Sequence, residues 1–369
     1  MSRVGPSRFS PAEHFPAGLR AGPVPVKRDY RAVLNLSSNE LQHPQLDDFF
    51  GGLLARLDGA DSVARYPYHP AALDHVASRC GVDARQATLS AGSDDAIRAL
   101  MWIVAPSSRT LVLQTPNYGA YAYHAQAAGV SIMPADVFGA DPDERLAILG
   151  RAVAATPRAC VVITDPDPVE GVALGVERLA ELAHRCAACG SLLVVDATYA
   201  AFAGIDHAPL IGGAGNVLVV RSYSKSHGLA GLRAAVVLGA PEAIAVLARW
   251  RSINTVSSIT LALLVGALEQ PSFWAGVHED VGRWRDELSA QLRAARRDWS
   301  FSPSVTNFVL VDTGAPATAR DVAAGLEERG VVVKRFEDEP ALGACLRITV
   351  PPPAGIATLL AALQEVRVP

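Results

Sequence analysis

A lysine stands in a small-residue turn between two strand-like apolar runs, within the segment VVRSYSKSHGLAGLRAAVVLG (219–239). Ser222 and Ser224 come just before Lys225, and Arg233 follows after two glycines. A lysine beside an apolar strand end loses its proton more easily, and the neutral amine is a nucleophile toward carbonyl groups. The hydroxyl and guanidinium donors around it suit a phosphate. The turn therefore combines a candidate Schiff-base lysine with donors for an anion.

A second small-residue turn can complete a phosphate site. In AGSDDAI (91–97), Gly92 and Ser93 come directly before a helical pattern, and Asp94 follows them. A helix N-terminus exposes free N–H groups that bind anions. The same residues also fit an ordinary helix cap, in which Ser93 accepts a backbone hydrogen bond and Asp94 complements the helix dipole. Taken alone, this turn leaves both interpretations open.

An aspartate closes another apolar run. Asp196 ends LLVVDAT (192–198), and Tyr199 follows three residues later. A lone buried carboxylate is costly, so this aspartate must be paired or functional. A Schiff-base lysine beside a phosphate site indicates pyridoxal 5'-phosphate (PLP), whose pyridine nitrogen needs an acidic partner and whose ring hydroxyl can meet a phenol. A capping aspartate and a packing tyrosine are the alternative explanation.

The elements that must position these residues alternate between short β-branched runs and helical patterns. Continuous apolar strands alternating with helices indicate a mostly parallel α/β sheet covered on both faces, which binds ligands beyond the carboxyl ends of its strands. After about residue 240, a long helical stretch and a strand-and-helix tail predict a smaller α+β domain. We expect strands at 110–115, 159–165, 192–198, 217–222, 234–239, 306–312 and 345–350, and helices at 93–104, 175–190, within 241–298, near 317–330 and at 353–366.

These patterns divide the chain of 369 residues into three predicted parts. Residues 1–40 form an N-terminal arm that contributes to the small domain, and residues 41–250 form the large domain. Residues 251–369 hold a long connecting helix and the small C-terminal α+β domain. With 50% of its residues hydrophobic, the chain is ample for a core of this size.

Composition excludes several classes of protein. The net charge of −4 and the lack of a basic patch argue against nucleic acid as a partner. No apolar run approaches the roughly 18 residues of a membrane helix, and the N-terminus lacks the apolar stretch of a secretory signal. Five scattered cysteines indicate reduced thiols in a cytoplasm. The nine histidines show no HxxxH or HExxH spacing, so no catalytic metal is expected.

Together these segments resemble the class I/II aminotransferase family, which consists of fold-type I PLP enzymes, and within it the histidinol-phosphate aminotransferase-like branch. SYSKSHGLAGLR (222–233) resembles the family pattern S-x-S-K-x-x-x-x-x-G-x-R. VVDATYAAF resembles V-D-E-A-Y-x-x-F, and GSDDAI resembles G-S-D-E-A-I. The resemblance runs from about residue 33 to the end of the chain. It implies a large domain with a mostly parallel mixed sheet covered by helices, plus a smaller α+β domain.

The resemblance also implies roles for single residues. Lys225 is expected to hold PLP as a Schiff base and to move the substrate's α-proton, Asp196 to pair with the ring nitrogen, and Tyr199 to meet the O3′ hydroxyl. TPNYGAY (115–121) resembles T-P-T-Y-x-x-Y, so Tyr118 is expected to stack on the ring and border the substrate. The other implied cofactor contacts are Gly92, Ser93, Asp94, Ser222, Ser224 and Arg233.

Three further segments resemble parts of the family pattern that contact the substrate or a second subunit. RYPYHPAAL (65–73) resembles R-Y-P-D-P, whose tyrosine, here Tyr66, reaches the phosphate in the neighbouring subunit, which implies a homodimer with active sites at the subunit interface. LSSNE resembles L-x-x-N-E-N, so Asn39 is expected near the substrate. CLRITV resembles L-R-I-T-V-G, so Arg347 is expected to bind the substrate's α-carboxylate.

One segment departs from the family pattern. The family carries N-P-N-N-P-T-G where this chain has DPDPVEG (165–171), so Asp167 or Pro168 replaces the asparagine that donates to O3′. An ionised aspartate accepts hydrogen bonds and does not donate them. Glu170 likewise replaces a small residue. Near the C-terminus, acidic residues follow Lys334 and Arg335, and they would oppose a phosphorylated substrate.

The expected activity is transfer of an amino group from an amino acid or amino alcohol to a keto acid. The altered DPDPVEG segment keeps a second hypothesis open, namely a PLP-dependent decarboxylase, lyase or cyclase on the same fold in a specialised biosynthetic pathway. A non-catalytic scaffold is the third hypothesis. A scaffold needs none of the lysine, aspartate, tyrosine and arginines singled out above, so their joint presence argues against it.

Overall fold

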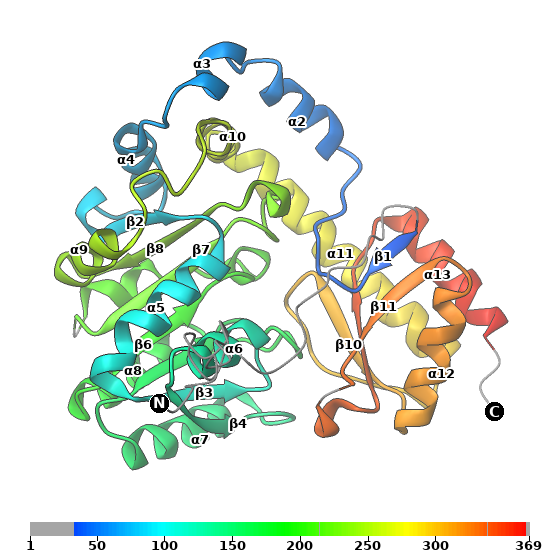
Figure 1. Ribbon diagram of the computed structural model, residues 1–369. Helices are drawn as coiled ribbons and strands as arrows, with labels where there is room; N and C mark the ends of the chain where they lie inside the picture. Colours follow the sequence, from blue (N-terminus) through cyan, green and yellow to red (C-terminus); the bar gives the residue numbers. More distant parts are fainter. Residues whose placement is uncertain (1–32, 214, 338, 367–369) are drawn as a thin grey trace, which may run out of the picture.

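A seven-stranded mixed sheet is the centre of the large domain (Figure 1). The computed structural model describes residues 33–213, 215–337 and 339–366. Strand β8 runs antiparallel to both of its neighbours, β7 and β2, and all other neighbouring strands are parallel. In the order in which they pair, the strands are β2 (Ala87–Ser90), β8 (Ala235–Gly239), β7 (Val217–Ser222), β6 (Leu192–Asp196), β5 (Cys160–Thr164), β3 (Thr110–Thr115) and β4 (Ser131–Asp136). The predicted mostly parallel mixed sheet is confirmed.

Successive residues of the central strands pack on opposite faces of this sheet, since side chains alternate along a strand. Val161 and Ile163 of β5 belong to one apolar cluster, whereas Cys160 and Val162 belong to another. Burial on both faces explains why these strands read as unbroken apolar runs. The helices of this domain are α2 (Leu46–Leu54), α3 (Gly59–Ala64), α4 (His69–Arg79), α5 (Ser93–Ser108), α6 (Gly119–Ala127), α7 (Pro142–Ala155), α8 (Val176–Ala188), α9 (Pro241–Trp250) and α10 (Ser258–Leu268).

The small domain is built on a five-stranded sheet in the order β1-β11-β12-β10-β9. Strand β1 (Leu34–Leu36) pairs in parallel with β11 (Val331–Arg335), and the other neighbours are antiparallel. The segment expected to be an arm therefore supplies an edge strand, although residues 1–32 lie outside the described residues. The remaining elements are β9 (Ser300–Phe301), β10 (Phe308–Asp312), β12 (Cys345–Thr349), α12 (Pro316–Glu327) and α13 (Pro353–Glu365).

The helical stretch expected over 241–298 is three helices, which corrects the prediction of one long stretch. Ser257 caps α10 by accepting a hydrogen bond from the Thr260 amide, and Pro271 begins α11 (Pro271–Ala295). A capping serine and a proline at a first helical position both mark helix starts. Helix α11 then runs from the large domain to the small one (Figure 1). In the part of the chain that the structure describes, there are also five short 3₁₀ helices, at Ala84–Gln86, Ala200–Ala203, Ala208–Gly212, Ala230–Leu232 and Pro340–Leu342.

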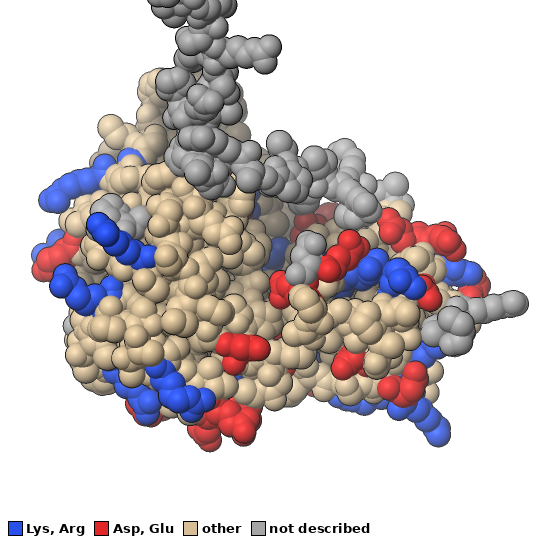
Figure 2. Space-filling view, turned by 60° about the horizontal axis from the view of Figure 1, so that its bottom comes forward, with Lys and Arg blue, Asp and Glu red and all other residues tan. Residues whose placement is uncertain are grey.

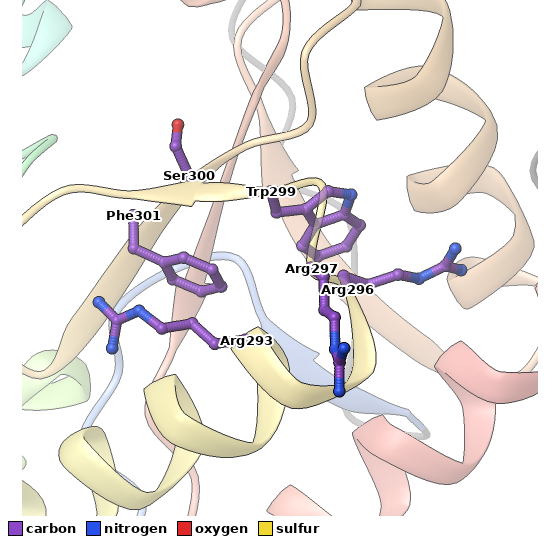
Figure 3. A pocket seen from close by; sticks show the side chains of 6 residues that line it. All are labelled: Arg293, Arg296, Arg297, Trp299, Ser300 and Phe301. Carbon is purple, nitrogen blue, oxygen red and sulfur yellow. The ribbon is translucent and has the colours of Figure 1, made fainter.

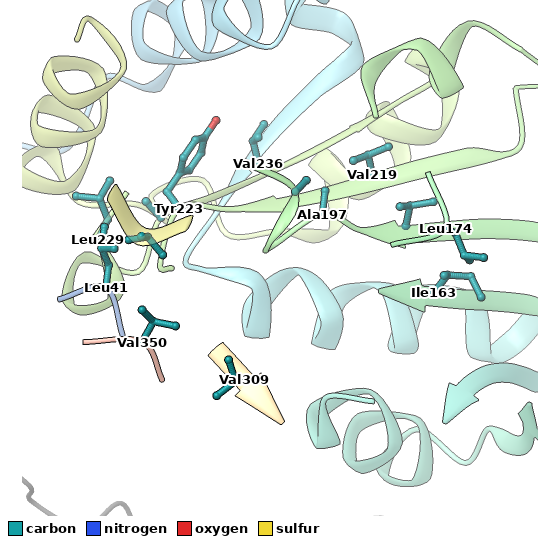
Figure 4. Packing of buried hydrophobic residues seen from close by; sticks show 14 of the residues in the cluster. Leu41, Ile163, Leu174, Ala197, Val219, Tyr223, Leu229, Val236, Val309 and Val350 are labelled. Atoms are coloured by element: carbon teal, nitrogen blue, oxygen red, sulfur yellow. The ribbon is translucent and has the colours of Figure 1, made fainter. Parts of the chain in front are cut away.

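One apolar cluster joins the two domains. Val309 of β10 and Val350, which follows β12, belong to the same cluster as Val219 and Val236 of the large sheet. Figure 4 shows these small-domain residues and Leu229 lying beyond one edge of the large sheet. The small sheet is thereby held near the ends of the large domain's strands.

Charged side chains lie on the surface (Figure 2), whereas the apolar helix α10 contributes residues to the core. On the face shown in Figure 2, lysine and arginine side chains are interspersed with aspartate and glutamate. Among the described helices, none is both long enough and apolar enough to cross a membrane. Helix α10, with the sequence SITLALLVGAL, has only 11 residues, and Leu263 and Leu264 are buried in the core.

Candidate active site

The carboxyl ends of three neighbouring parallel strands bring the predicted residues to one edge of the large sheet. Strand β6 ends at Asp196, which lies beside Thr164 at the end of β5 and Val220 of β7. Strand β7 ends at Ser222, and Lys225 follows in the next turn. This is the edge at which α/β sheets commonly bind ligands.

Lys225 reaches from this edge to the small-domain segment that follows β1. Its Nζ donates a hydrogen bond of 2.6 Å to the backbone carbonyl of Ser38. The amides of His227 and Leu229 both donate to the Tyr223 carbonyl, which closes the turn that carries the lysine. Lys225 itself is half-buried, so its amine is held at the boundary between the two domains.

Asp196 is a buried carboxylate held by three donors. Its Oδ2 accepts from the Tyr121 hydroxyl at 2.9 Å, and its Oδ1 accepts from the Thr198 amide and hydroxyl at 3.0 and 2.5 Å. Burial raises the pKa of Asp196, and the hydrogen bonds from Thr198 and Tyr121 counteract this shift. A buried anion of this kind favours a cationic ligand group beside it.

Tyr121 is a site residue that sequence reasoning missed. Its ring is fully buried below the sheet edge, and its hydroxyl is committed to Asp196. It lies in the first turn of α6, in the same TPNYGAY segment as Tyr118, the residue that precedes the helix. The second tyrosine of the segment that matches T-P-T-Y-x-x-Y was the signal that could have identified it.

Tyr199 and Asn39 meet from opposite domains. The Asn39 Nδ2 donates to the Tyr199 hydroxyl at 2.9 Å. Asn39 has a left-handed backbone (φ 52°), and it is fixed by the Thr349 hydroxyl, which accepts from its amide, and by Asn307, which donates to its carbonyl. Burial raises the pKa of Tyr199, while nearby Arg347 and the Asn39 hydrogen bond lower it. The phenol is therefore oriented by the small domain.

The two predicted small-residue turns meet at Arg233. Its Nη2 donates to Asp94 at 3.0 Å, and its Nη1 donates to the Ser224 hydroxyl at 3.3 Å. A Cβ added to Gly92, where φ is +80°, would overlap the Arg233 guanidinium. Only glycine therefore lets the first turn approach this arginine. The two turns and Arg233 together supply hydroxyl, amide and guanidinium donors, which suit a phosphate. Ser93 begins α5, and Ser222 accepts from the Ser224 amide.

Of two further predicted tyrosines, one contacts the turn at Gly92 and the other is exposed on the surface. Tyr118 donates its hydroxyl to Asp94 at 2.9 Å and is half-exposed, so it borders the turn that carries Gly92 and Asp94. Tyr66 lies between α3 and α4 with 86% of its surface exposed. No hydrogen bond or ring contact joins Tyr66 to the described site residues of its own chain, so its predicted place beside a second subunit stays a prediction.

Arg347 of β12 supplies a partly buried cation from the small domain. Its Nη1 donates to the Pro168 carbonyl at 2.6 Å, and its guanidinium lies 5.2 Å from the Phe308 ring and 5.8 Å from the Phe336 ring. Among the described residues, its Nε has no hydrogen-bond partner. Burial lowers the pKa of Arg347. A guanidinium with an open donor, oriented by carbonyl and ring contacts, suits a carboxylate ligand.

Asp167 lies close enough to Tyr199 and Arg347 to influence both electrostatically, but its carboxylate is bound by other groups of the chain. Its Oδ1 accepts from the Val169 and Glu170 amides at 2.8 and 2.7 Å, and its Oδ2 accepts from Gln114 at 2.6 Å and from Arg145 at 3.1 Å. Both oxygens are therefore occupied within the chain. These contacts anchor segment 165–171, and the predicted contact of Asp167 with the cofactor stays a prediction.

A surface pocket lies apart from the predicted residues. It has a volume of about 300 Å³ and is lined by the end of α11 and by β9 (Figure 3). Arg293 lies 4.6 Å from the Phe301 ring and Arg296 lies 5.6 Å from the Trp299 ring. Packing of arginine on aromatic rings accounts for this arrangement.

The buried Asp196 generates a stability prediction. Its raised pKa means that the folded state binds the proton more tightly than the unfolded state, so ionisation destabilises the fold above the ordinary aspartate pKa of about 4. We expect Asp196→Asn to raise the thermal midpoint at pH 7 by roughly 2 °C, in protein purified without added ligand, and to have no such effect near pH 4. The exposed Asp298→Asn is the matched control. A lower midpoint for Asp196→Asn at pH 7 would contradict this account.

Solved structures of similar fold place this architecture among known enzymes. The histidinol-phosphate aminotransferase from Sinorhizobium meliloti, in complex with pyridoxal-5'-phosphate, superimposes with a TM-score of 0.81 at 23% identity over 99% of both chains. The aspartate aminotransferase from Thermus thermophilus with maleate has a TM-score of 0.77 at 21% identity, over 91% of this chain and 92% of the other. At these identities the likeness concerns the fold.

Sequence comparison identifies the family. The chain matches the model of aminotransferase class I and II over residues 31–363. The histidinol-phosphate aminotransferase of Geobacter sulfurreducens is 30% identical over 354 residues, which cover 94% of this chain and 97% of the relative. That of Granulibacter bethesdensis is 31% identical over 86% of this chain and 85% of the relative. The chain therefore belongs to the class I and II aminotransferase family.

Proposed function

We propose that the chain is a PLP-dependent aminotransferase that transfers an amino group from an amino acid or amino alcohol to a keto acid. The observation that carries this assignment is the meeting of Lys225, Asp196 and the Arg233 turn at one sheet edge, in a chain that matches the aminotransferase family over nearly its whole length. The similar Sinorhizobium structure contains PLP. When bound, PLP supplies a carbonyl that condenses with amines and a ring that accepts electrons.

The described residues fit this cofactor. The turn at Gly92 comes so close to Arg233 that it has no room for a side chain, and Ser224 adds a hydroxyl. The part of the site around Arg233 therefore suits the phosphate of the cofactor. Asp196 is buried and accepts three hydrogen bonds, which stabilise its anionic form. Its carboxylate therefore suits the protonated pyridine nitrogen. Tyr199, oriented by Asn39, suits the ring hydroxyl.

Each side chain then has a distinct task. With the cofactor bound, Lys225 would remove the proton from the substrate's α-carbon as a positioned general base. Asp196 keeps a proton on the ring nitrogen. Arg347 binds the substrate's α-carboxylate, while the Pro168 and Ser37 carbonyls hold its guanidinium in one orientation. Orientation of the reacting groups by such contacts lowers the entropic part of the barrier.

The alternative chemistry has less support. The acids of DPDPVEG, which kept a decarboxylase, lyase or cyclase open, are paired with Arg145 inside the protein. The oxygens of both acids are therefore engaged by donors of the chain itself. The L-threonine-O-3-phosphate decarboxylase from Porphyromonas gingivalis, with a TM-score of 0.72 at 18% identity, shares the fold alone.

The donor is proposed to be unphosphorylated. Arg335, a basic residue near the C-terminal strands, pairs with Glu337 at 3.1 Å, and Lys334 lies 5.6 Å from the Phe336 ring. The Arg335–Glu337 ion pair offsets positive charge that a phosphorylated donor would need. The named relatives act, by their names, on histidinol phosphate, so the proposed donor differs from theirs.

We also propose a cytoplasmic homodimer with active sites at the subunit interface. Tyr66 and Tyr68 are 86% and 75% exposed in the single chain, although large aromatic side chains are usually buried or placed at interfaces. All five cysteines are unpaired, as is common in a reducing compartment.

Single-turnover reactions test the proposed chemistry. Protein loaded with PLP is mixed with a panel of amino acids, amino alcohols and histidinol phosphate, without a keto acid, and products are identified by mass. We expect pyridoxamine phosphate and a keto acid or aldehyde from one unphosphorylated donor, and a loss of at least roughly 10²-fold in rate for Lys225→Ala. Release of carbon dioxide or ammonia with PLP intact would instead show a decarboxylase or lyase. Preference for histidinol phosphate would refute the unphosphorylated donor.

Mixing two inactive variants tests the shared site. If Tyr66 serves the neighbouring subunit, Tyr66→Ala and Lys225→Ala each lose activity, but a mixed dimer contains one complete site. Refolding the two together is expected to restore about a quarter of the wild-type activity, because half of the dimers are mixed and half of their sites are complete. Tyr68→Ala, also exposed, is the control for Tyr66→Ala. A fully active monomer, or no recovery on mixing, would contradict the proposal.

A further inference from the structure

A fully buried arginine anchors the segment in which this chain departs from its family. Arg145 of α7 is only 2% exposed, and its Nε donates to the Ala140 carbonyl at 2.8 Å. Its Nη1 donates to Asp167 at 3.1 Å, and its Nη2 forms a short hydrogen bond to Glu170. The two acids that replace small or amide residues of the family pattern therefore share one cation.

Hydrogen bonds from other groups also hold the two acids that contact Arg145. Glu170 also accepts from the Gly139 amide at 3.2 Å, and Asp167 accepts from Gln114 and from two amides of its own loop. Burial raises the pKa of Glu170, and Arg145 is the main influence that lowers it. Removing a buried cation leaves carboxylates without compensation, which disrupts the structure that holds them.

The opposite side of the same segment contacts the small domain. The Pro168 carbonyl accepts from Arg347 at 2.6 Å, and the Gly171 carbonyl accepts from the Val305 amide at 3.0 Å. Val169 is buried in a small apolar cluster with Leu310 and other residues of the small domain. Segment 165–171 therefore connects Arg145, in the large domain, with Arg347, in the small one.

We propose that Arg145 is a positioning residue that holds segment 165–171 so that the Pro168 carbonyl orients Arg347 toward the substrate's carboxylate. This inference rests on the proposed function, in which Arg347 binds the α-carboxylate. The contact at Pro168 is made by a backbone carbonyl, so the orientation of Arg347 depends on the placement of the backbone of this segment. Arg145, Asp167 and Glu170 fix that backbone from behind.

The test compares an amino acid donor with the amine that lacks its carboxylate. Arg145→Met is expected to raise KM for the amino acid roughly 10- to 100-fold, since small displacements of a binding group have effects of this size. KM for the amine is expected to stay unchanged, because the amine makes no contact with Arg347. Arg145→Lys retains the charge and is expected to recover part of the loss. The control is Arg151→Met, an exposed position on the same helix.

Several outcomes would overturn the inference. An unchanged amino acid KM in Arg145→Met would do so, and an equal rise for amino acid and amine would assign Arg145 a purely structural role. If Arg145→Met does not fold, Glu170→Gln, which weakens one contact of Arg145, is expected to raise KM for the amino acid alone by a smaller factor. No rise in Glu170→Gln would then count against the inference.

Arg347→Gln separates this inference from the proposed function. If Arg347→Gln leaves the amino acid KM unchanged, the proposed carboxylate-binding role of Arg347 fails, and the inference fails with it. If Arg347→Gln raises that KM while Arg145→Met does not, only the positioning role of Arg145 is refuted.

Discussion

The burial of the Asp196 carboxylate is the constraint around which the large domain is arranged. A buried carboxylate is tolerated only when donors surround it. Tyr121 and Thr198 supply them from α6 and from the residue pair after β6. Because β6 lies between β5 and β7, the same strand end is also beside the turn that carries Lys225. The anion and the amine are thus placed by one parallel sheet.

The small domain completes this site with short segments that carry few residues each. Asn39 orients Tyr199, the Ser38 carbonyl accepts from Lys225, and Arg347 enters from β12. All three are hydrogen bonds made by a side chain, one to another side chain and two to backbone carbonyls. Such contacts fix direction well, which is the property that a stereospecific reaction needs from its binding groups.

Much of the fold and of the site was predictable, for identifiable reasons. Strands buried on both faces leave unbroken apolar runs, and the spacing from Ser222 to Arg233 matches the family pattern. The break between α9, α10 and α11 was missed because Ser257 and Pro271 act locally within an otherwise helical composition. Arg145 carried no signal, since an arginine in an amphipathic helix usually faces solvent. Its burial follows only from the acids that tertiary folding brings to it.

The pairing of β1 with β11 has a consequence for how the protein is made. Residues 34–36 lie beside residues 331–333, so β1 cannot pair until β11 has been synthesised. The segment that contacts Lys225 and Tyr199 cannot settle until almost the whole chain has left the ribosome. Contacts this distant in sequence form slowly. The large domain can therefore fold during synthesis, whereas the finished site is a late, post-synthetic event.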